Sequence, residues 1–203
     1  GIMYEKGLGV PQDYLQAVSW YRLAAEQGYA DAQLNLGLMI ESGRGAPQDD
    51  KNAVEWFQRA ADQGNIFAKF KLGGMYYQGH GVPQDYIKAI KLFRLAAESG
   101  VGEAQNNLGV IYLNGSGAAQ DDKEAFKWYR LAAEQGHASA QSDLGWMFAN
   151  GRGTPKNLSE AEKWYRLAVE QHFINAQSHL GKMYAEGQGV PQSRVVAYAL
   201  LNS

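Results

Sequence analysis

The sequence lacks cysteine altogether, and this absence removes several classes of function at once. None of its 203 residues is a cysteine. Disulfide bridges, thiolate metal sites and cysteine nucleophiles are therefore excluded. A cysteine-free chain is compatible with either redox state, so the absence does not identify a cellular compartment.

The sequence also lacks a strong excess of positive or negative charge, and it lacks long apolar runs. Lys+Arg is 19 and Asp+Glu is 21, which gives a formal net charge of −2, and no run of Lys or Arg occurs. Because nucleic-acid-binding proteins usually present a basic face, we expect no nucleic-acid partner. No stretch approaches the roughly 18 apolar residues of a transmembrane helix, so we expect no membrane insertion by this segment. The first residues do not resemble a signal peptide.

Tryptophan, proline and glycine recur with a period of 36 residues. Four of the five tryptophans share one phase, all five prolines share another, and most of the 24 glycines fall in a few more, without any insertion along the chain. A repeat of this length predicts stacked supersecondary units, none of which can bury its apolar face alone. The tryptophans in phase are Trp20, Trp56, Trp128 and Trp164, and the prolines are Pro11, Pro47, Pro83, Pro155 and Pro191.

Each unit reads as two helices joined by a turn. Ala32, Leu36 and Ile40 recur at helical spacing and define a first helix, which we call helix A. The segment 43–47, with two glycines and a proline, ends that helix. A second helix, helix B, begins at Asp49, whose residue type suits an N-cap. The same phase holds Asp13, Asp85, Asp121, Asn157 and Ser193.

A glycine recurs in the middle of helix A, as at Gly37. Glycine in a helix interior costs about 1 kcal/mol relative to alanine, so its recurrence indicates a packing reason. We expect the missing Cβ to let helix B approach closely, with tryptophan and tyrosine of helix B filling the adjoining space.

These positions together resemble the Sel-one-like repeat, a relative of the tetratricopeptide repeat. The pattern is A-x-x-x-L-G-x-x-Y-x-x-G-x-G-V-P-x-D-x-x-x-A-x-x-W-Y-x-x-A-A-x-x-G, and residues 104–136 follow it well. The resemblance implies an all-α fold, a right-handed superhelical α/α solenoid of 36-residue helix-turn-helix repeats with helix A lining the concave side. It also implies a bacterial protein of the periplasm, the envelope or the secreted fraction.

The repeat register predicts one repeat domain over residues 1–203, with five to six repeats. Gly1 aligns with Gly37 and Ser203 with Leu167. We therefore expect a fragment that is truncated within a repeat at both ends. Three departures from the pattern, where we expect looser local packing, are Leu92 in a tryptophan position, Ala119 in a proline position and His172 in a glycine position.

Candidate chemistry is sparse, and we expect no catalytic residue, no metal and no cofactor. The recurring G-x-G has no preceding strand, which a dinucleotide site would need. The four histidines form no pair at zinc-ligand spacing. Some proteins resembling this family are linked to β-lactam binding. A β-lactam hydrolase would need an S-x-x-K nucleophile or an equivalent, and no serine is followed three residues later by lysine.

The positions of helix A that change between repeats predict the functional surface. They lie nearly opposite the recurring face of the helix, and we call them the helix-A stripe. By the resemblance, this stripe is the concave surface. Aromatic and amide side chains there suit a peptide groove. The partner-binding residues predicted on it are Leu38, Glu41, Phe70, Tyr77, Asn106, Val110, Leu113, Asn114, Ser142, Trp146, Asn150 and Lys182. The alternative is that Phe70, Tyr77 and Trp146 pack into neighbouring repeats as core.

The sequence thus favours a non-enzymatic scaffold that binds a peptide segment or a folded protein on its helix-A face. A structural spacer or self-association module is the first alternative. An enzyme would need a pocket with perturbed titratable groups, and nothing in the sequence predicts one. The identity of the partner and the oligomeric state are not encoded in any motif.

Overall fold

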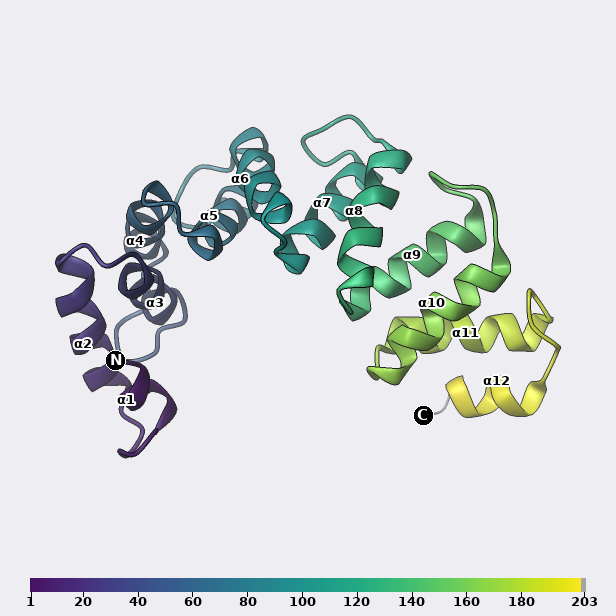
Figure 1. Cartoon of the computed structure of the whole chain (residues 1–203), viewed down its shortest axis with the longest axis horizontal. Helices are drawn as coiled ribbons and strands as arrows, with labels where there is room; N and C mark the ends of the chain where they lie inside the picture. Colours follow the sequence, from purple (N-terminus) through teal and green to yellow (C-terminus); the bar gives the residue numbers. More distant parts are fainter. Residues whose placement is uncertain (202–203) are drawn as a thin grey trace. The chain divides into compact units, whose positions relative to one another are not determined.

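The computed structural model describes residues 1–201 and consists there of helices, with no strand among these residues (Figure 1). Contacts divide the chain into two compact units, which we call unit 1, Gly1–Ser99, and unit 2, Gly100–Ser203. Unit 1 contains α1 (Ile2–Lys6), α2 (Tyr14–Glu26), α3 (Ala30–Glu41), α4 (Asp50–Asp62), α5 (Ile66–Gln78) and α6 (Tyr86–Glu98). Unit 2 contains α7 (Gly102–Asn114), α8 (Asp122–Glu134), α9 (Ala138–Asn150), α10 (Leu158–Glu170), α11 (Ile174–Glu186) and α12 (Arg194–Leu201).

Odd-numbered helices correspond to helix A and even-numbered helices to helix B, so each 36-residue unit is one helix-turn-helix pair. Within each unit, the main packing contacts join each helix to the next one along the chain. The fold class expected from the sequence, an all-helical solenoid of such pairs, is confirmed. None of the helices within residues 1–201 combines the length and the apolar composition that crossing a bilayer requires.

The predicted N-caps of helix B are all confirmed. In α4 the Asp49 carboxylate accepts a hydrogen bond from the Asn52 amide at 3.1 Å. In α12 the Ser193 hydroxyl accepts one from the Val196 amide at 3.3 Å. These bonds satisfy N–H groups that have no partner inside the helix, which explains why the position is restricted to short polar residues. Equivalent caps occur at Asp13, Asp85, Asp121 and Asn157.

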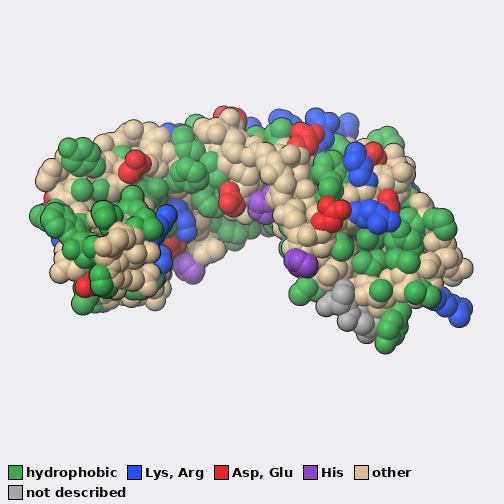
Figure 2. All heavy atoms as spheres, turned by 60° about the horizontal axis from the view of Figure 1, so that its bottom comes forward, with side chains coloured by type: hydrophobic (Ala, Val, Ile, Leu, Met, Phe, Trp, Pro, Cys, Tyr) green, Lys and Arg blue, Asp and Glu red, His purple; other side chains and the backbone are tan. Residues whose placement is uncertain are grey.

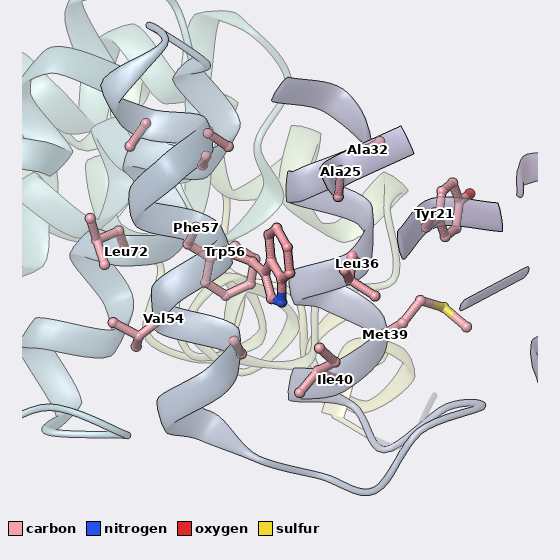
Figure 3. Close-up of a cluster of buried hydrophobic side chains, with 14 of the residues drawn as sticks. Tyr21, Ala25, Ala32, Leu36, Met39, Ile40, Val54, Trp56, Phe57 and Leu72 are labelled. Atoms are coloured by element: carbon pink, nitrogen blue, oxygen red, sulfur yellow. The ribbon is translucent and has the colours of Figure 1, made fainter. Parts of the chain in front are cut away.

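The mid-helix glycine permits close helix packing, as expected. A Cβ added at Gly37 would lie 2.6 Å from Cε1 of Phe57, and one added at Gly109 would lie 2.6 Å from Cδ1 of Tyr129. The side chain that fills this space is the residue after the recurring tryptophan, not the tryptophan itself. Phe57 is fully buried in the core of unit 1, where it faces α3 from α4 (Figure 3).

The expectation that the recurring tryptophans all fill buried space is only partly right. Trp56 and Trp128 are 7% and 4% exposed, whereas Trp20 is 51% exposed. The helix A of the first repeat, α1, has 5 residues where α3 has 12, so fewer side chains are available to cover Trp20. Burial at this phase therefore depends on what the neighbouring helix provides.

Buried glutamines form a hydrogen-bonded link between helices that the repeat pattern did not predict. Gln33 in α3 donates from Nε2 to the Ala25 carbonyl in α2 at 3.1 Å, and its Oε1 accepts from Gln63 Nε2 after α4 at 2.7 Å. Gln141 makes the same two contacts, to the Ala133 carbonyl and from Gln171. Each glutamine thus connects three consecutive helices and satisfies its own buried amide.

Candidate functional site

The helix-A stripe of unit 1 is largely committed to packing within the unit. Leu38 packs against the hydrophobic core as a partly buried side chain. The Phe70 ring lies 5.9 Å from the ring of Phe93, and the Tyr77 ring lies 6.3 Å from it. The Phe93 side chain is itself buried. These contacts support the alternative in which Phe70 and Tyr77 contribute mainly to internal packing.

Glu41 on α3 is also engaged inside unit 1. Its carboxylate pairs with the Lys71 ammonium on α5 at 3.3 Å, and both side chains are partly exposed. Charges in this setting interact weakly because water screens them. The stripe of unit 1 therefore presents a neutralised and mostly packed surface.

The helix-A stripe of unit 2 is different, because Trp146 on α9 lies between two cavities. The larger has a volume of about 550 Å³ and is lined by Leu113, Asn114, Gln120, Asp143, Trp146, Arg152 and His179. The smaller has a volume of about 240 Å³ and includes Trp146, Asn150, Lys156, His179 and Lys182 in its lining. Trp146 and His179 line both, so the two cavities adjoin along α9 and α11.

The remaining predicted residues of unit 2 lie outside these cavities. Val110 is partly buried and packs against the unit 2 core. The Oδ1 atom of Asn106 is buried and has no hydrogen-bond partner among the described residues. Ser142 is only 3% exposed, so its assignment as a partner-binding residue is corrected. The helical phase of Ser142 matches the stripe, but neighbouring helices cover it.

Two titratable residues that line the larger cavity, Asp143 and His179, were not predicted from the sequence. They occupy equivalent positions in successive repeats, a phase that also holds Asn35, Lys71 and Asn107. This repeat position borders the helix-A stripe, and its residue type changes from repeat to repeat. That variation is the feature of the sequence that could have indicated a functional role.

Burial dominates the electrostatics of this cavity. It raises the pKa of Asp143 to about 6, although a hydrogen bond from the Ser139 hydroxyl acts in the opposite direction. It also lowers the pKa of His179, with a further contribution from the nearby Lys182 ammonium. The His179 ring stacks on Tyr165, with centroids 5.1 Å apart. The structure thus contains a pocket with perturbed titratable groups, which nothing in the sequence predicted.

An ion pair fixes Arg152 at the rim of the larger cavity. Its guanidinium forms two hydrogen bonds with the Asp122 carboxylate, the one from Nη2 measuring 2.7 Å. This bidentate contact lowers the pKa of Asp122. The guanidinium carbon of Arg152 also lies 5.7 Å from the centroid of the Trp146 ring. Arg152 thus holds the indole in place while its own charge is compensated.

Lysine and arginine side chains are interspersed with aspartate and glutamate on the face drawn in Figure 2, in keeping with the nearly balanced composition. Among the described residues, no group of three or more histidine and carboxylate side chains is arranged to hold a metal ion. An aromatic ring, amides and a few charged groups line the adjoining cavities around Trp146.

Comparison with known proteins identifies the repeat. The family model of the Sel1 repeat matches six segments, residues 1–29, 30–65, 66–101, 102–137, 138–173 and 174–203. A comparison with curated proteins gave no match.

Solved structures agree with this match. The antigen c5321, described as a protective antigen of uropathogenic Escherichia coli with an SLR fold, is 35% identical over 98% of this chain, with a TM-score of 0.91. A Sel1 repeat protein from Oxalobacter formigenes is 35% identical over 98% of this chain, with a TM-score of 0.89, and the match covers 80% of that protein. The chain spans only 43% of the length of c5321.

A more distant structure, the immunity protein Pa5087 from Pseudomonas aeruginosa, is 19% identical over 98% of this chain and 80% of its own, with a TM-score of 0.58, and shares the fold alone. Together with the six matched segments, the 35% identity to two bacterial relatives confirms the resemblance drawn from the repeat pattern. The chain belongs to the Sel1 repeat family.

Proposed function

We propose that this chain is a non-enzymatic protein-interaction scaffold that binds a peptide segment of a partner protein along the helix-A stripe of α7, α9 and α11. Sel1 repeat proteins generally mediate protein–protein interactions, which supports the general class. Of the residues predicted on the stripe, those proposed to contact the segment are Leu113, Asn114, Trp146, Asn150 and Lys182.

One observation carries this proposal: Trp146 is partly exposed between two adjoining cavities. Tryptophan is enriched among residues that dominate binding energy, since its ring buries a large area at a small entropic cost. Asn114 and Asn150 are exposed on either side; the Asn150 Nδ2 donates to the Trp146 carbonyl at 2.8 Å, so its amide oxygen and the Asn114 amide are proposed to bond the main chain of an extended peptide. A spacer that only set distances would not need this arrangement.

Catalysis is less well supported by the same cavity. The one hydroxyl bonded to Asp143 belongs to Ser139, which lies one turn earlier on α9 and is not among the residues that line the cavity. A nucleophile has to be presented to its substrate next to a base. We therefore propose that the shifted groups serve recognition.

Selection of peptides by the purified chain tests the proposal. A phage-displayed random peptide library is panned against the protein, and the affinities of enriched peptides are measured by calorimetry. We expect Trp146→Ala to weaken binding by about tenfold or more. Trp20→Ala is the matched control, since it removes an exposed tryptophan from helix B of unit 1.

Each outcome decides between surfaces. Peptides that bind Trp146→Ala as tightly as wild type would move the site away from α9. A library that yields no binder would contradict the peptide-binding proposal. Circular dichroism of each variant confirms that the fold is retained.

A second candidate, self-association, is favoured by the apolar surface of α12. Val195 and Tyr198 are 81% and 72% exposed, whereas Val54, at the phase of Tyr198 in the second repeat, is buried. Sedimentation equilibrium of wild type and of a Val195→Ser/Tyr198→Ser variant tests it. A wild-type dimer that the variant loses would support the candidate, and a monomer in both would refute it.

We also propose a location in the bacterial envelope or the secreted fraction. The relatives at 35% identity come from bacteria, and one of them is described as a protective antigen. Immunoblotting of cell fractions checks this proposal. Recovery in the cytosolic fraction alone would contradict it.

A further inference from the structure

Asp143 is a partly buried carboxylate that lacks a cationic partner within the described residues. It lies in the middle of α9 and lines the larger cavity of unit 2. Among the residues that the structure describes, the one polar contact that shifts its ionisation is the hydrogen bond from the Ser139 hydroxyl. A hydroxyl satisfies one lone pair of a carboxylate and leaves its charge uncompensated.

The groups that face Asp143 from the surrounding helices do not supply a positive charge. Tyr129 on α8 and Tyr165 on α10 are buried phenols whose pKa values are raised by burial and by Asp143 itself. His179 on α11 has its pKa lowered by burial, which favours the neutral ring. Arg152 lines the same cavity, but its guanidinium is bound bidentately by Asp122. The cavity therefore carries one uncompensated negative charge.

The lysines of the adjoining cavity are in a different situation. The Lys182 side chain is 70% exposed and lies 3.9 Å from the Glu186 carboxylate. Water solvates such a charge, so an additional partner adds little. A carboxylate out of water interacts far more strongly with an incoming cation, because the effective dielectric constant is lower. Asp143, and not Lys182, is therefore the charge that an incoming partner would compensate.

We propose that the larger cavity of unit 2 binds the cationic side chain of a lysine or arginine, with its charged end on the Asp143 carboxylate and its methylene groups against Trp146 and Leu113. This inference rests on the proposed function, since it assigns the chemistry of one residue in the bound segment. The Trp146 indole lines the cavity and suits the apolar stem of such a side chain, while the Asp143 carboxylate takes its charge.

The first test uses small probes, so that it does not depend on finding the partner. The probes are Nα-acetyl-lysine methylamide and Nα-acetyl-arginine methylamide, with the norleucine and citrulline analogues as neutral counterparts. Binding is measured by chemical-shift perturbation in ¹⁵N spectra. The cationic probes are expected to shift the amides of α9 and the Trp146 indole, and the neutral probes to bind about tenfold more weakly or not at all.

Variants decide whether Asp143 is responsible. Asp143→Asn keeps the shape and a hydrogen-bond acceptor for Ser139 but removes the charge, so it should reduce binding of the cationic probes to the level of the neutral ones. Glu103→Gln is the control, since it removes an exposed carboxylate from the same unit. Equal binding of cationic and neutral probes, or unchanged binding by Asp143→Asn, would overturn the proposal.

The pH dependence gives an independent readout. Because the pKa of Asp143 is about 6, lowering the pH from about 7.5 to about 5 protonates the carboxyl group. The affinity for the lysine probe should then fall by about fivefold or more. A wild type with no pH dependence would count against the proposal, and Asp143→Asn should lose most of the dependence.

Failure of this inference is distinguishable from failure of the proposed function. Library peptides that require Trp146 but bind Asp143→Asn with unchanged affinity would refute the cationic pocket and leave the peptide groove intact. Absence of any peptide binder would refute peptide binding along the helix-A stripe. The small probes would still test whether the larger cavity binds a cationic side chain. Selected peptides that carry lysine or arginine and lose affinity when it is replaced by norleucine would support both.

Discussion

At the scale of single residues, Asp143 combines a binding role with an energetic disadvantage. Burial raises its pKa to about 6 from the 3.8 expected in the unfolded chain, so the folded state binds the proton more tightly. The resulting stabilisation is fully present below about pH 4 and is lost as the pH rises through about 6. At neutral pH the folded chain holds an ionised carboxylate in an environment that disfavours it.

Asp143→Asn should therefore stabilise the protein at about pH 7.5. We expect the free energy of unfolding to rise by about 1–3 kcal/mol there and to change little at about pH 4, where the native carboxyl is already protonated. Urea denaturation followed by circular dichroism at both pH values measures this. A variant that is less stable than wild type at the higher pH would show that the charge has a partner in solution.

The tryptophans give a second residue-scale prediction. Trp128→Ala should lower the free energy of unfolding by about 3–5 kcal/mol, because the indole is buried and its Nε1 donates to Glu124 at 3.2 Å. Trp146→Ala should cost much less stability and mainly weaken peptide binding. Thermal denaturation of both variants provides the comparison. Equal destabilisation would mean that Trp146 belongs to the core.

The capping residues could be predicted from the sequence, whereas Asp143, His179 and the recurring buried glutamines could not. The caps from Asp13 to Ser193 recur in one phase and were all identified. Asp143 and His179 differ from their counterparts in the other repeats, so periodicity alone gave them no role. Ser142 was misassigned because the angular position on a helix does not tell how far a neighbouring helix extends over it.

At the scale of the helices, Gly37 in α3 and Gly74 in α5 provide a matched pair, because both lie inside a helix A but have different surroundings. Gly37→Ala should destabilise the protein, because its Cβ would lie 2.6 Å from the Phe57 ring in a close-packed core. Gly74→Ala should stabilise it by about 1 kcal/mol, since nothing lies within 4 Å of the added carbon and alanine favours the helix. Chemical denaturation of the two variants is the measurement. Stabilisation by both would refute the close-approach explanation.

The N-caps of helix B lead to a prediction about a single helix end. The Asp121 carboxylate accepts from the amides of Lys123 and Glu124 at 2.9 and 3.1 Å. Asp121→Ala should cost about 1 kcal/mol, whereas Asp121→Asn should be nearly neutral because it keeps an acceptor. Thermal denaturation compares the three proteins. A loss in Asp121→Asn equal to that in Asp121→Ala would indicate a role for the charge in place of the cap.

Helix positions could be predicted well because glycine, proline and the caps mark both ends of each helix. The depth of burial could not, as the difference between Trp20 and Trp56 illustrates. Both have the same local sequence role, but α1 offers Trp20 a short neighbour. Burial is a property of the pair of helices, which a local pattern does not contain.

At the scale of the whole molecule, stability should be distributed locally. The main contacts join helices that follow one another, so a perturbation is expected to spread chiefly to adjacent repeats. Tyr129→Ala should increase amide hydrogen exchange in α7 to α10 and leave α2 to α4 unchanged. Exchange measured by mass spectrometry tests this, and a uniform increase along the chain would show global cooperativity. The single domain expected over residues 1–203 stays a prediction that the same data address.

The glutamine link has a consequence for how such a chain changes length. Gln33 takes its side-chain partner, Gln63, from its own repeat, and from the preceding repeat it requires only a main-chain carbonyl, that of Ala25. Every polypeptide offers such a carbonyl at the end of a helix, whatever its side chains. A duplicated 36-residue segment therefore carries the side-chain partner that its own buried glutamine needs, and a deleted segment removes both. Unequal recombination can lengthen or shorten the gene without leaving a buried amide unbonded at the new junction.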